Sequence, residues 1–236
     1  MKTTTILFDL DGTLLPMDQD VFVKHYFAGL AAKAATRGYD PKQLIDAIWA
    51  GIHAMVKNNG SCSNEAAFWK TFSDIFGEAA LQDKPMFEEF YANEFQKIQS
   101  VCGYEPGVAA MIHDLQQRGY RLVLATNPVF PAIATQSRIR WAGLTPEDFL
   151  HYTTYENSSN CKPNPAYYQS ILDRIGASAE ECLMVGNDVT EDMVAAKLGM
   201  KVFLLTDWLI NKQNVDINQF PHGSFEELRQ FLDALA

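Results

Sequence analysis

Basic residues are scarce in this chain of 236 residues, which carries 19 Lys and Arg against 29 Asp and Glu. The formal net charge is -10, and no run of Lys or Arg would form a basic patch. Nucleic-acid binding depends on contacts between such cations and phosphates. We therefore expect no nucleic-acid partner, and an anionic substrate would need a local cation or a metal ion.

Cysteines and long apolar runs are also few. The four cysteines form no C-x-x-C pair and match no zinc-site spacing. Their even number leaves disulfides open, but free thiols in a reducing cytosol are the better expectation. No apolar run approaches the length of a membrane span, and Asp9 and Asp11 break the N-terminal apolar stretch, unlike in a signal peptide. The sequence predicts a cytoplasmic protein with no membrane partner.

Two patterns of apolar residues divide the chain. Residues 17–100 show helical periodicity for four helices and no convincing strand; the last helix runs through Phe87, Tyr91, Phe95 and Ile98. Elsewhere, apolar strands alternate with helices. Strands that are apolar throughout are buried on both faces, which is typical of a parallel sheet covered by helices. The predicted strands are 4–8, 121–125, 149–153, 181–185 and 201–205, and the helices between and after them are 106–118, 131–141, 165–175, 193–198 and 225–235.

The simplest architecture is an α/β fold with an insertion. Residues 1–15 and 102–236 would form a Rossmann-like core, a parallel sheet with helices on both faces. Residues 16–101 would form an α-helical cap domain inserted just after the first strand. Open α/β sheets bind ligands at the carboxyl ends of their strands. An insertion at this point is therefore expected to act as a lid over the site.

Two carboxylates follow the first strand, Asp9 and Asp11. In an extended chain, residues two apart point the same way, so both could face one site. Crowded carboxylates repel each other unless a cation lies between them or one is protonated. This pattern predicts a metal-assisted nucleophile with an acid/base neighbour. A plain acidic turn is the alternative, because Asp11-Gly12 is a common turn dipeptide.

Three further polar stretches also follow strands or open helices. Thr126 and Asn127 offer a hydroxyl and an amide that could hold phosphate oxygens, although Asn-Pro also favours a plain turn. Lys162 lies in a proline-stiffened loop before a helix, which suits an anion, although a solvated lysine is the alternative. Asp188 and Asp192 offer the oxygen ligands that Mg²⁺ prefers. Acidic residues there would also stabilise a helix N-terminus without any metal.

Taken together, the four stretches resemble the four motifs of the haloacid dehalogenase superfamily of phosphohydrolases, in the same order. The helical insertion is similar to the cap that these enzymes carry between the first and second motifs. The resemblance covers the whole core and does not identify the substrate. The four stretches are Asp9-Leu10-Asp11-Gly12-Thr13, Ala125-Thr126-Asn127-Pro128, Cys161-Lys162-Pro163-Asn164-Pro165 and Val185-Gly186-Asn187-Asp188-Val189-Thr190-Glu191-Asp192.

The resemblance implies a role for each polar residue. Asp9 would be the nucleophile that forms an aspartyl-phosphate. Asp11 would be the general acid and base. Lys162 would neutralise the aspartyl-phosphate. The transferring phosphoryl group would be bound by a set of four residues, namely Lys162, Thr126, Asn127 and Thr13.

A Mg²⁺ cofactor is also implied by the resemblance. The Asp9 side chain, the Asp11 carbonyl and Asp188 would hold the ion, which would screen the approach of a carboxylate to a phosphate dianion. Many relatives have Gly-Asp in the fourth motif, whereas Asn187 separates Gly from Asp188 here. We expect Asp188 to be the direct ligand, with Asp192 behind it or as a further ligand.

The expected function is Mg²⁺-dependent hydrolysis of a small phosphate monoester, such as a sugar phosphate, a nucleoside monophosphate or phosphoglycolate. Hydrolytic dehalogenases of this superfamily generally lack the second acid of the first motif, so Asp11 favours phosphoryl chemistry. A phosphomutase would use the same residues. A phosphonate hydrolase would need a cap lysine, and no feature selects Lys24, Lys33 or Lys57. A non-catalytic binding protein is expected to lose the nucleophile or the metal acids, and both are intact here.

Overall fold

A six-stranded parallel sheet forms the centre of the computed structural model, which describes residues 2–235. Its strand order is β3-β2-β1-β4-β5-β6, so β1 lies between β2 and β4. This confirms the predicted Rossmann-like parallel sheet. The strands are β1 (Thr5–Phe8), β2 (Arg121–Leu124), β3 (His151–Tyr152), β4 (Cys182–Gly186), β5 (Lys201–Leu205) and β6 (His222–Gly223).

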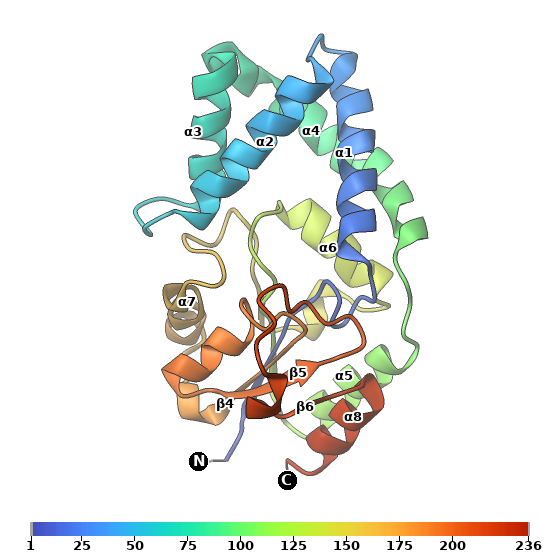
Figure 1. The fold of residues 1–236 in the computed structure, drawn as a ribbon, viewed down its shortest axis with the longest axis vertical. Coiled ribbons are helices and arrows are strands. Elements are labelled where there is room, and N and C mark those ends of the chain that lie inside the picture. Colours follow the sequence, from blue (N-terminus) through green and yellow to red (C-terminus); the bar gives the residue numbers. More distant parts are fainter. Residues whose placement is uncertain (1, 236) are drawn as a thin grey trace.

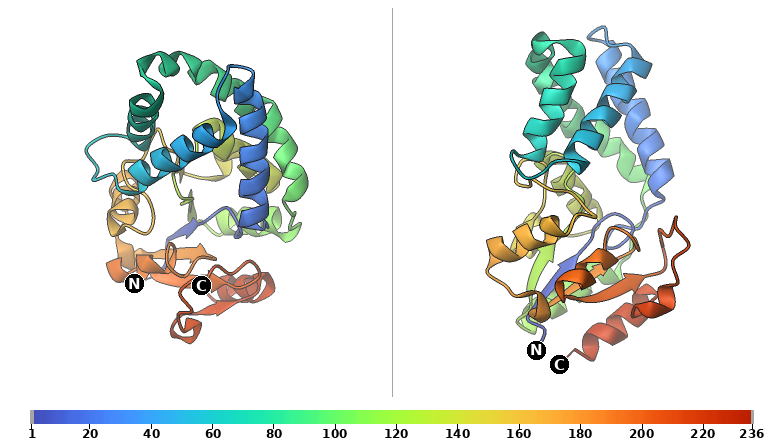
Figure 2. Two further views of the ribbon diagram at one scale, coloured as in Figure 1. Left: turned by 45° about the horizontal axis from the view of Figure 1, so that its top comes forward. Right: turned by 60° about the vertical axis from the view of Figure 1, so that its left-hand side comes forward.

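Helices cover both faces of the sheet (Figures 1 and 2). Alternate residues of a strand point to opposite faces, so Ile6 packs into one core and Leu7 into the other. The core around Ile6 includes residues of α5 (Gly107–Gln117) and α8 (Phe225–Asp233), and the core around Leu7 includes residues of α7 (Pro165–Ile175). Coverage on both faces explains why the central strands are apolar throughout.

A second group of helices lies beyond the carboxyl ends of the strands, at the top of Figure 1. Its second helix begins at a capping pair, since Asp40 accepts a hydrogen bond from the Gln43 amide and Pro41 takes the first helical position. The group comprises α1 (Gln19–Ala35), α2 (Pro41–Val56), α3 (Asn64–Phe76) and α4 (Lys84–Ala92), with the 3₁₀ helices η1 (Glu78–Asp83) and η2 (Glu94–Val101).

The prediction of one continuous fourth helix in this group is wrong. The chain leaves α-helical geometry at Asn93, with φ -119° and ψ -75°, and then continues as η2. Both the side-chain amide and the backbone amide of Asn93 donate to the carbonyl of Glu89, so Asn93 caps the end of α4. The apolar spacing survives the break, since Phe87 and Phe95 are both buried.

The other differences concern short elements. Residues 193–198 form a 3₁₀ helix, η5 (Met193–Leu198), rather than an α-helix, and β3 is shorter than expected. The sequence gives no signal for β6, because two residues carry too little pattern. The elements that remain are α6 (Ala132–Trp141), η3 (Pro146–Asp148), η4 (Ala179–Glu181) and η6 (Ile217–Gln219).

Two further observations bear on the expectations from composition. Across residues 2–235, no helix combines the length and the apolar character that crossing a bilayer requires. The four cysteines are free thiols, with Cys161 and Cys182 buried and Cys62 exposed.

Candidate active site

The polar stretches come together because three strands end at one edge of the sheet. Phe8, the last residue of β1, pairs with Leu124 of β2 and with Val185 of β4. The pairing between β1 and β4 continues one residue past β1, where the Asp9 amide donates to the Val185 carbonyl at 2.9 Å. Because neighbouring parallel strands in register end at the same edge of the sheet, the residues that follow them lie close together.

Lys162 is the cation at the centre of this edge. Its Nζ donates to Oδ1 of Asp9 at 2.8 Å and to Oδ1 of Asp192 at 2.6 Å. Its side chain is only 1% exposed. Burial opposes the positive charge, but the carboxylates of Asp192 and Asp9 outweigh it and hold the pKa of Lys162 well above its ordinary value. Lys162 therefore stays protonated between two buried carboxylates.

Thr13 and Asn187 hold the other side of Asp9. The Thr13 hydroxyl lies 3.4 Å from Oδ2 of Asp9 and 3.2 Å from Oδ1 of Asn187. The Nδ2 of the Asn187 side chain donates to the Trp208 carbonyl at 2.6 Å. Gly12 has a φ of 82°, and a Cβ there would overlap the Asn187 side chain. The turn after β1 therefore requires glycine, and Asn187 connects this turn to the loop after β5.

Asp11 pairs with a cation that lies outside the four motifs. Nη1 of Arg138, on α6, donates to its Oδ2, and the Arg138 side chain is 1% exposed. Burial raises the pKa of Asp11 to about 6, although the charge of Arg138 opposes the shift. The other oxygen, Oδ1, is buried and has no hydrogen-bond partner within residues 2–235. One oxygen of this carboxyl group is thus fixed and the other is free.

The fourth motif forms a turn that supports Lys162. Oδ1 of Asp188 accepts from the amides of Thr190 at 2.7 Å and Glu191 at 2.9 Å. Oδ2 of Asp192 accepts from the Asp188 amide at 2.9 Å, while its other oxygen binds Lys162. Burial raises the pKa of Asp192, against the charge of Lys162. Both oxygens of Asp192 are therefore engaged within the protein.

The second motif contacts the fourth through Asn127. Its side-chain amide donates to Oε2 of Glu191 at 2.9 Å, and its buried Oδ1 is without a partner in the part of the chain that the structure describes. Burial raises the pKa of Glu191 to about 8. Thr126 is buried, and its carbonyl accepts from the hydroxyls of Thr153 and Tyr167.

The donor set at this edge is compatible with Mg²⁺, which prefers oxygen ligands and usually keeps several waters. The acids Asp9, Asp192 and Glu191 surround the ammonium of Lys162, so this edge is rich in oxygen donors. Among residues 2–235, no three His, Cys, Asp or Glu side chains converge as a metal cluster by themselves. The set that the sequence predicts contains two side chains and one main-chain carbonyl, so it needs no such cluster.

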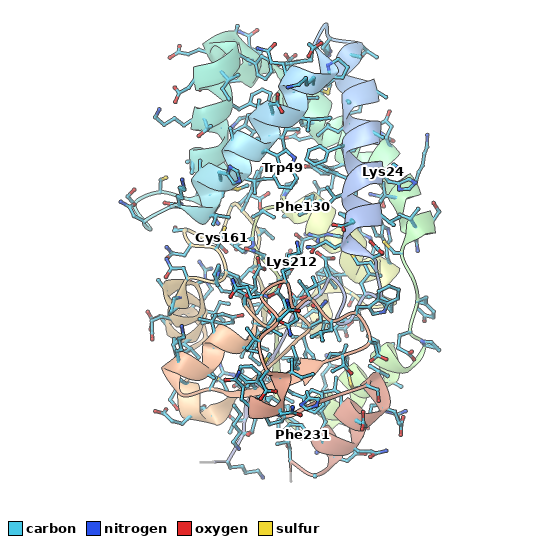
Figure 3. The ribbon with its side chains drawn as sticks, in the orientation of Figure 1. Lys24, Trp49, Phe130, Cys161, Lys212 and Phe231 are labelled. Atoms are coloured by element: carbon cyan, nitrogen blue, oxygen red, sulfur yellow. The ribbon has the colours of Figure 1, made fainter. Side chains whose placement is uncertain are left out.

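An open cleft of about 580 Å³ reaches Asp11 and Asn187 from the surface. It runs between residues 17–20 and the loop of residues 206–212. Figure 3 shows Lys212 of this loop, together with Phe130 and Cys161, between the upper helices and the sheet. The cleft is acidic, since its lining includes Asp11, Asp18, Asp20 and Asp207 and, within residues 2–235, the single cation Lys212.

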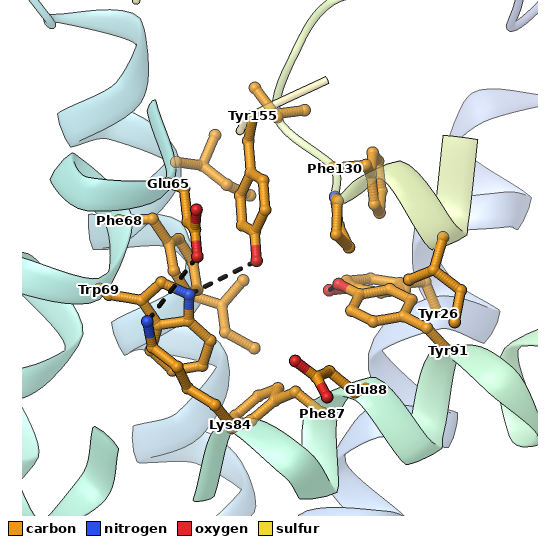
Figure 4. Close-up of a pocket in the computed structure, with 15 residues that line it drawn as sticks. Tyr26, Glu65, Phe68, Trp69, Lys84, Phe87, Glu88, Tyr91, Phe130 and Tyr155 are labelled. Atoms are coloured by element: carbon orange, nitrogen blue, oxygen red, sulfur yellow. Dashed lines mark hydrogen bonds and ion pairs between the residues drawn. The ribbon is translucent and has the colours of Figure 1, made fainter. Parts of the chain in front are cut away.

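An aromatic pocket of about 70 Å³ lies between the upper helices and the segment that precedes α6 (Figure 4). Phe130 forms one wall, and the guanidinium of Arg138 lies 4.5 Å from the centre of its ring. The polar atoms of the lining are mostly paired, as in the hydroxyls of Tyr26 and Tyr91 at 2.9 Å. Other lining residues are Phe68, Trp69, Phe87, Tyr155 and the charged Glu65, Lys84 and Glu88.

Sequence reasoning missed two of the side chains that complete this edge. Glu191 lies inside the fourth motif, but a glutamate in an acidic turn gives no sign that it will be buried. Arg138 lies in a helix 127 positions after Asp11. The one sign of its burial is that this cationic residue stands in the helix close to Ala134 and Ile139, which are both buried.

The chain is similar to known phosphatases over most of its length. It is 29% identical over 206 residues to a protein of Vibrio cholerae named phosphoglycolate phosphatase, covering 85% of this chain and 83% of that protein. A phosphatase structure from Thermococcus onnurineus matches with a TM-score of 0.62 at 19% identity and covers 98% of both chains.

A second solved structure, that of the hydrolase YfnB from Bacillus subtilis, is described as bound to magnesium. It matches with a TM-score of 0.58 at 20% identity and covers 99% of this chain and 100% of that one. Residues 3–199 match the family model for haloacid dehalogenase-like hydrolases. The match spans the four motifs and the upper group of helices, α1 to α4. This chain therefore belongs to the haloacid dehalogenase-like hydrolase family.

Proposed function

We propose that this hydrolase is a phosphatase that cleaves a small phosphate monoester through an aspartyl-phosphate on Asp9. The observation that carries the proposal is the buried Asp9 carboxylate, held by Lys162 and placed two residues before the acid Asp11. The name of the Vibrio cholerae relative supports the same reaction class.

In the first step, a carboxylate oxygen of Asp9 attacks phosphorus and the bond to the leaving oxygen breaks. The electron pair stays on the leaving oxygen, which takes a proton from the Asp11 carboxyl group. The raised pKa of Asp11, about 6, keeps a protonated fraction near neutral pH. The products are an alcohol, an Asp11 carboxylate and a phosphorylated Asp9.

In the second step, the Asp11 carboxylate takes a proton from water, and the resulting oxygen nucleophile attacks phosphorus. The bond between phosphorus and Asp9 breaks, and inorganic phosphate leaves. Lys162 offsets negative charge in both steps, because its ammonium already touches Asp9 at 2.8 Å. Asp192 keeps that ammonium in place rather than ligating a metal, since both of its oxygens are engaged.

We propose that Mg²⁺ assists this reaction. The Asp9 side chain, the Asp11 carbonyl and Asp188 would hold it. When bound, such an ion screens the repulsion between a carboxylate and a phosphate dianion. Thr13 and Thr126 would offer hydroxyls to the phosphoryl oxygens, and Asn127 would offer its amide.

We also propose that residues 16–101 form a cap over a core of residues 1–15 and 102–236. The cap would exclude water and select the leaving group. The acidic cleft and the aromatic pocket, whose charged lining consists of Glu65, Lys84 and Glu88, both disfavour an additional anionic group on the substrate. A neutral, partly apolar leaving group fits these surroundings best.

The first prediction tests the reaction itself. Phosphate release should require Mg²⁺ and should vanish in Asp9→Asn, because an amide is a poor nucleophile. A panel of phosphate monoesters with colorimetric phosphate detection measures both requirements. Asp173→Asn, an exposed acid on α7, is the matched control and should keep full turnover. Turnover in Asp9→Asn equal to that of the control would contradict the mechanism.

A further inference from the structure

Arg138 is a buried cation to which the four motifs give no role. It projects from α6, the helix that follows the loop carrying Thr126 and Asn127. Besides its ion pair with Asp11, its Nε lies 3.4 Å from the Ala134 carbonyl and its Nη2 lies 3.4 Å from Oγ1 of Thr135. These contacts hold the guanidinium in one orientation in the absence of substrate.

The ring of Phe130 closes the remaining side of the guanidinium. It lies 4.5 Å from Cζ and separates Arg138 from the aromatic pocket. Phe130 is held in turn by an edge-to-face contact with Tyr26 at 5.3 Å, from α1 (Figure 4). Arg138 is therefore enclosed by Asp11, its own helix and an aromatic wall, with 1% of its side chain exposed.

We propose that Arg138 is a positioning residue for the catalytic acid Asp11. It fixes Oδ2, so that Oδ1, which lacks a partner among the described residues, is the oxygen that exchanges the proton with the leaving group. This inference rests on the proposed phosphatase function. It adds a residue outside the four motifs and assigns the two oxygens of one carboxyl group to different tasks.

The chemistry of arginine suits this task. The guanidinium is a planar fork that orients a carboxylate and does not lose its proton in proteins. When Oδ1 gives its proton to the leaving oxygen, the new negative charge on Asp11 forms beside a fixed positive charge. When Oδ1 takes a proton from water in the second step, Arg138 still holds Oδ2. Arg138 itself gains and loses nothing.

Two other roles fit the observations less well. Binding an anionic part of the substrate would require the guanidinium to release Asp11 and cross the Phe130 ring. A role in stability alone is a weak explanation, because well-packed apolar residues commonly replace a buried ion pair at no loss of stability. Positioning uses every contact that Arg138 makes.

The test compares two kinds of ester. An alkyl phosphate needs a proton on its leaving oxygen, whereas p-nitrophenyl phosphate releases a stable phenolate and does not. Release of the leaving group in the first turnover reports the first step alone, whereas kcat also includes the second step, in which Asp11 activates water for both esters. We expect Arg138→Met to slow this release from the alkyl ester about 100-fold, the size of effect that a misplaced catalytic group causes. For p-nitrophenyl phosphate, we expect a loss of less than about tenfold. Arg138→Lys should fall between, since it keeps the charge but not the fork.

Arg140→Met is the matched control, because Arg140 is exposed on the same helix and its one side-chain hydrogen bond among the described residues goes to Ser137. It should leave both esters unaffected. A double-mutant cycle completes the test. In an Asp11→Asn background, Arg138→Met should change turnover of p-nitrophenyl phosphate by less than about twofold, because it acts through the removed carboxyl group.

The outcomes separate the inference from the function on which it rests. Equal slowing of first-turnover leaving-group release from both esters by Arg138→Met, or a full further loss in the Asp11→Asn background, would overturn the positioning role while leaving a phosphatase. Hydrolysis of neither ester, nor of any other monoester, by the unmodified enzyme with Mg²⁺ would overturn both.

Discussion

At the scale of single residues, Lys162 lies between two buried carboxylates and offsets the electrostatic repulsion between them. Removing it in Lys162→Met leaves Asp9 and Asp192 uncompensated, which costs about 3–5 kcal/mol of unfolding free energy for a broken buried pair. Turnover should fall as well, because the charge on the reacting group is no longer offset. Urea denaturation and phosphate release measure the two effects.

The loss of stability in Lys162→Met should depend on pH. An acid whose folded-state pKa is raised above its unfolded value stabilises the folded state at low pH, and this contribution disappears as pH rises through the folded value. Asp192 is such a group, and its folded-state pKa would be raised further without the positive charge of Lys162. The variant should therefore lose more stability at pH 8 than at pH 5. Lys42→Met, which breaks an exposed pair with Asp46, should cost less than about 1 kcal/mol at either pH.

His151 allows a pH prediction away from the active site. Partial burial and the charge of Arg174 lower its pKa from 6.5 to about 4 in the folded protein. Because the unfolded chain binds this proton more readily, the contribution of His151 to stability is complete above pH 6.5 and falls as pH drops towards 4.

His151→Gln removes that contribution. Between pH 7 and pH 5, the unmodified protein should lose more unfolding free energy than the variant, and denaturant titrations at several pH values measure the difference. Solvent around this half-buried ring limits the size of the effect. Parallel stability curves for the two proteins would contradict the prediction.

At the scale of elements, Phe95 joins the upper helices to the core. It is fully buried in η2 and stacks on Trp141 of α6 with 5.1 Å between ring centres. Phe95→Ala should cost about 3–5 kcal/mol, the range for removing a buried aromatic side chain. Ile75→Ala, at a site 41% exposed on α3, should cost far less and is the control. Thermal denaturation measures both, and equal losses would show that the contact with α6 matters little.

The elements themselves could be predicted where their pattern is long. The buried strands β1, β2, β4 and β5 and the helices α5 to α8 follow from apolar runs and capping residues, within one or two positions at their ends. The break at Asn93 could not be predicted, because the apolar spacing runs through it unchanged. The change of backbone geometry occurs at Asn93, which caps α4, and periodicity does not register a change at one residue.

At the scale of the whole molecule, the edge of the sheet that carries the candidate site was predictable from the alternation of strands and helices. Residues that follow parallel strands lie at one edge, and the observed order β2-β1-β4 makes Asp9, Thr126 and Asp188 neighbours there. Arg138 and the aromatic pocket could not be foreseen in this way. They depend on how α6 packs against α4 and η2, and only the folded chain sets that packing.

The net charge of the molecule is -10, and the cleft that leads to Asp11 is itself acidic. We expect kcat/KM for a monoester with a neutral leaving group to exceed that for one bearing a carboxylate by about tenfold or more at low salt. Raising the ionic strength to about 1 M, where the screening length is about 3 Å, should shrink that ratio. Steady-state kinetics with size-matched esters measure it.

Asp20→Asn combined with Asp207→Asn is the direct test of this electrostatic selection. Both residues line the cleft, and neither belongs to the proposed catalytic set. Neutralising them should raise kcat/KM for the carboxylate-bearing ester more than for the neutral one, mainly through KM, because the change acts on approach and binding rather than on the chemical step. The same two substitutions at the exposed Asp46 on α2 and Asp74 on α3, neither of which lines the cleft, are the control. If the control variant changes the ratio equally, overall charge and not the cleft sets the preference.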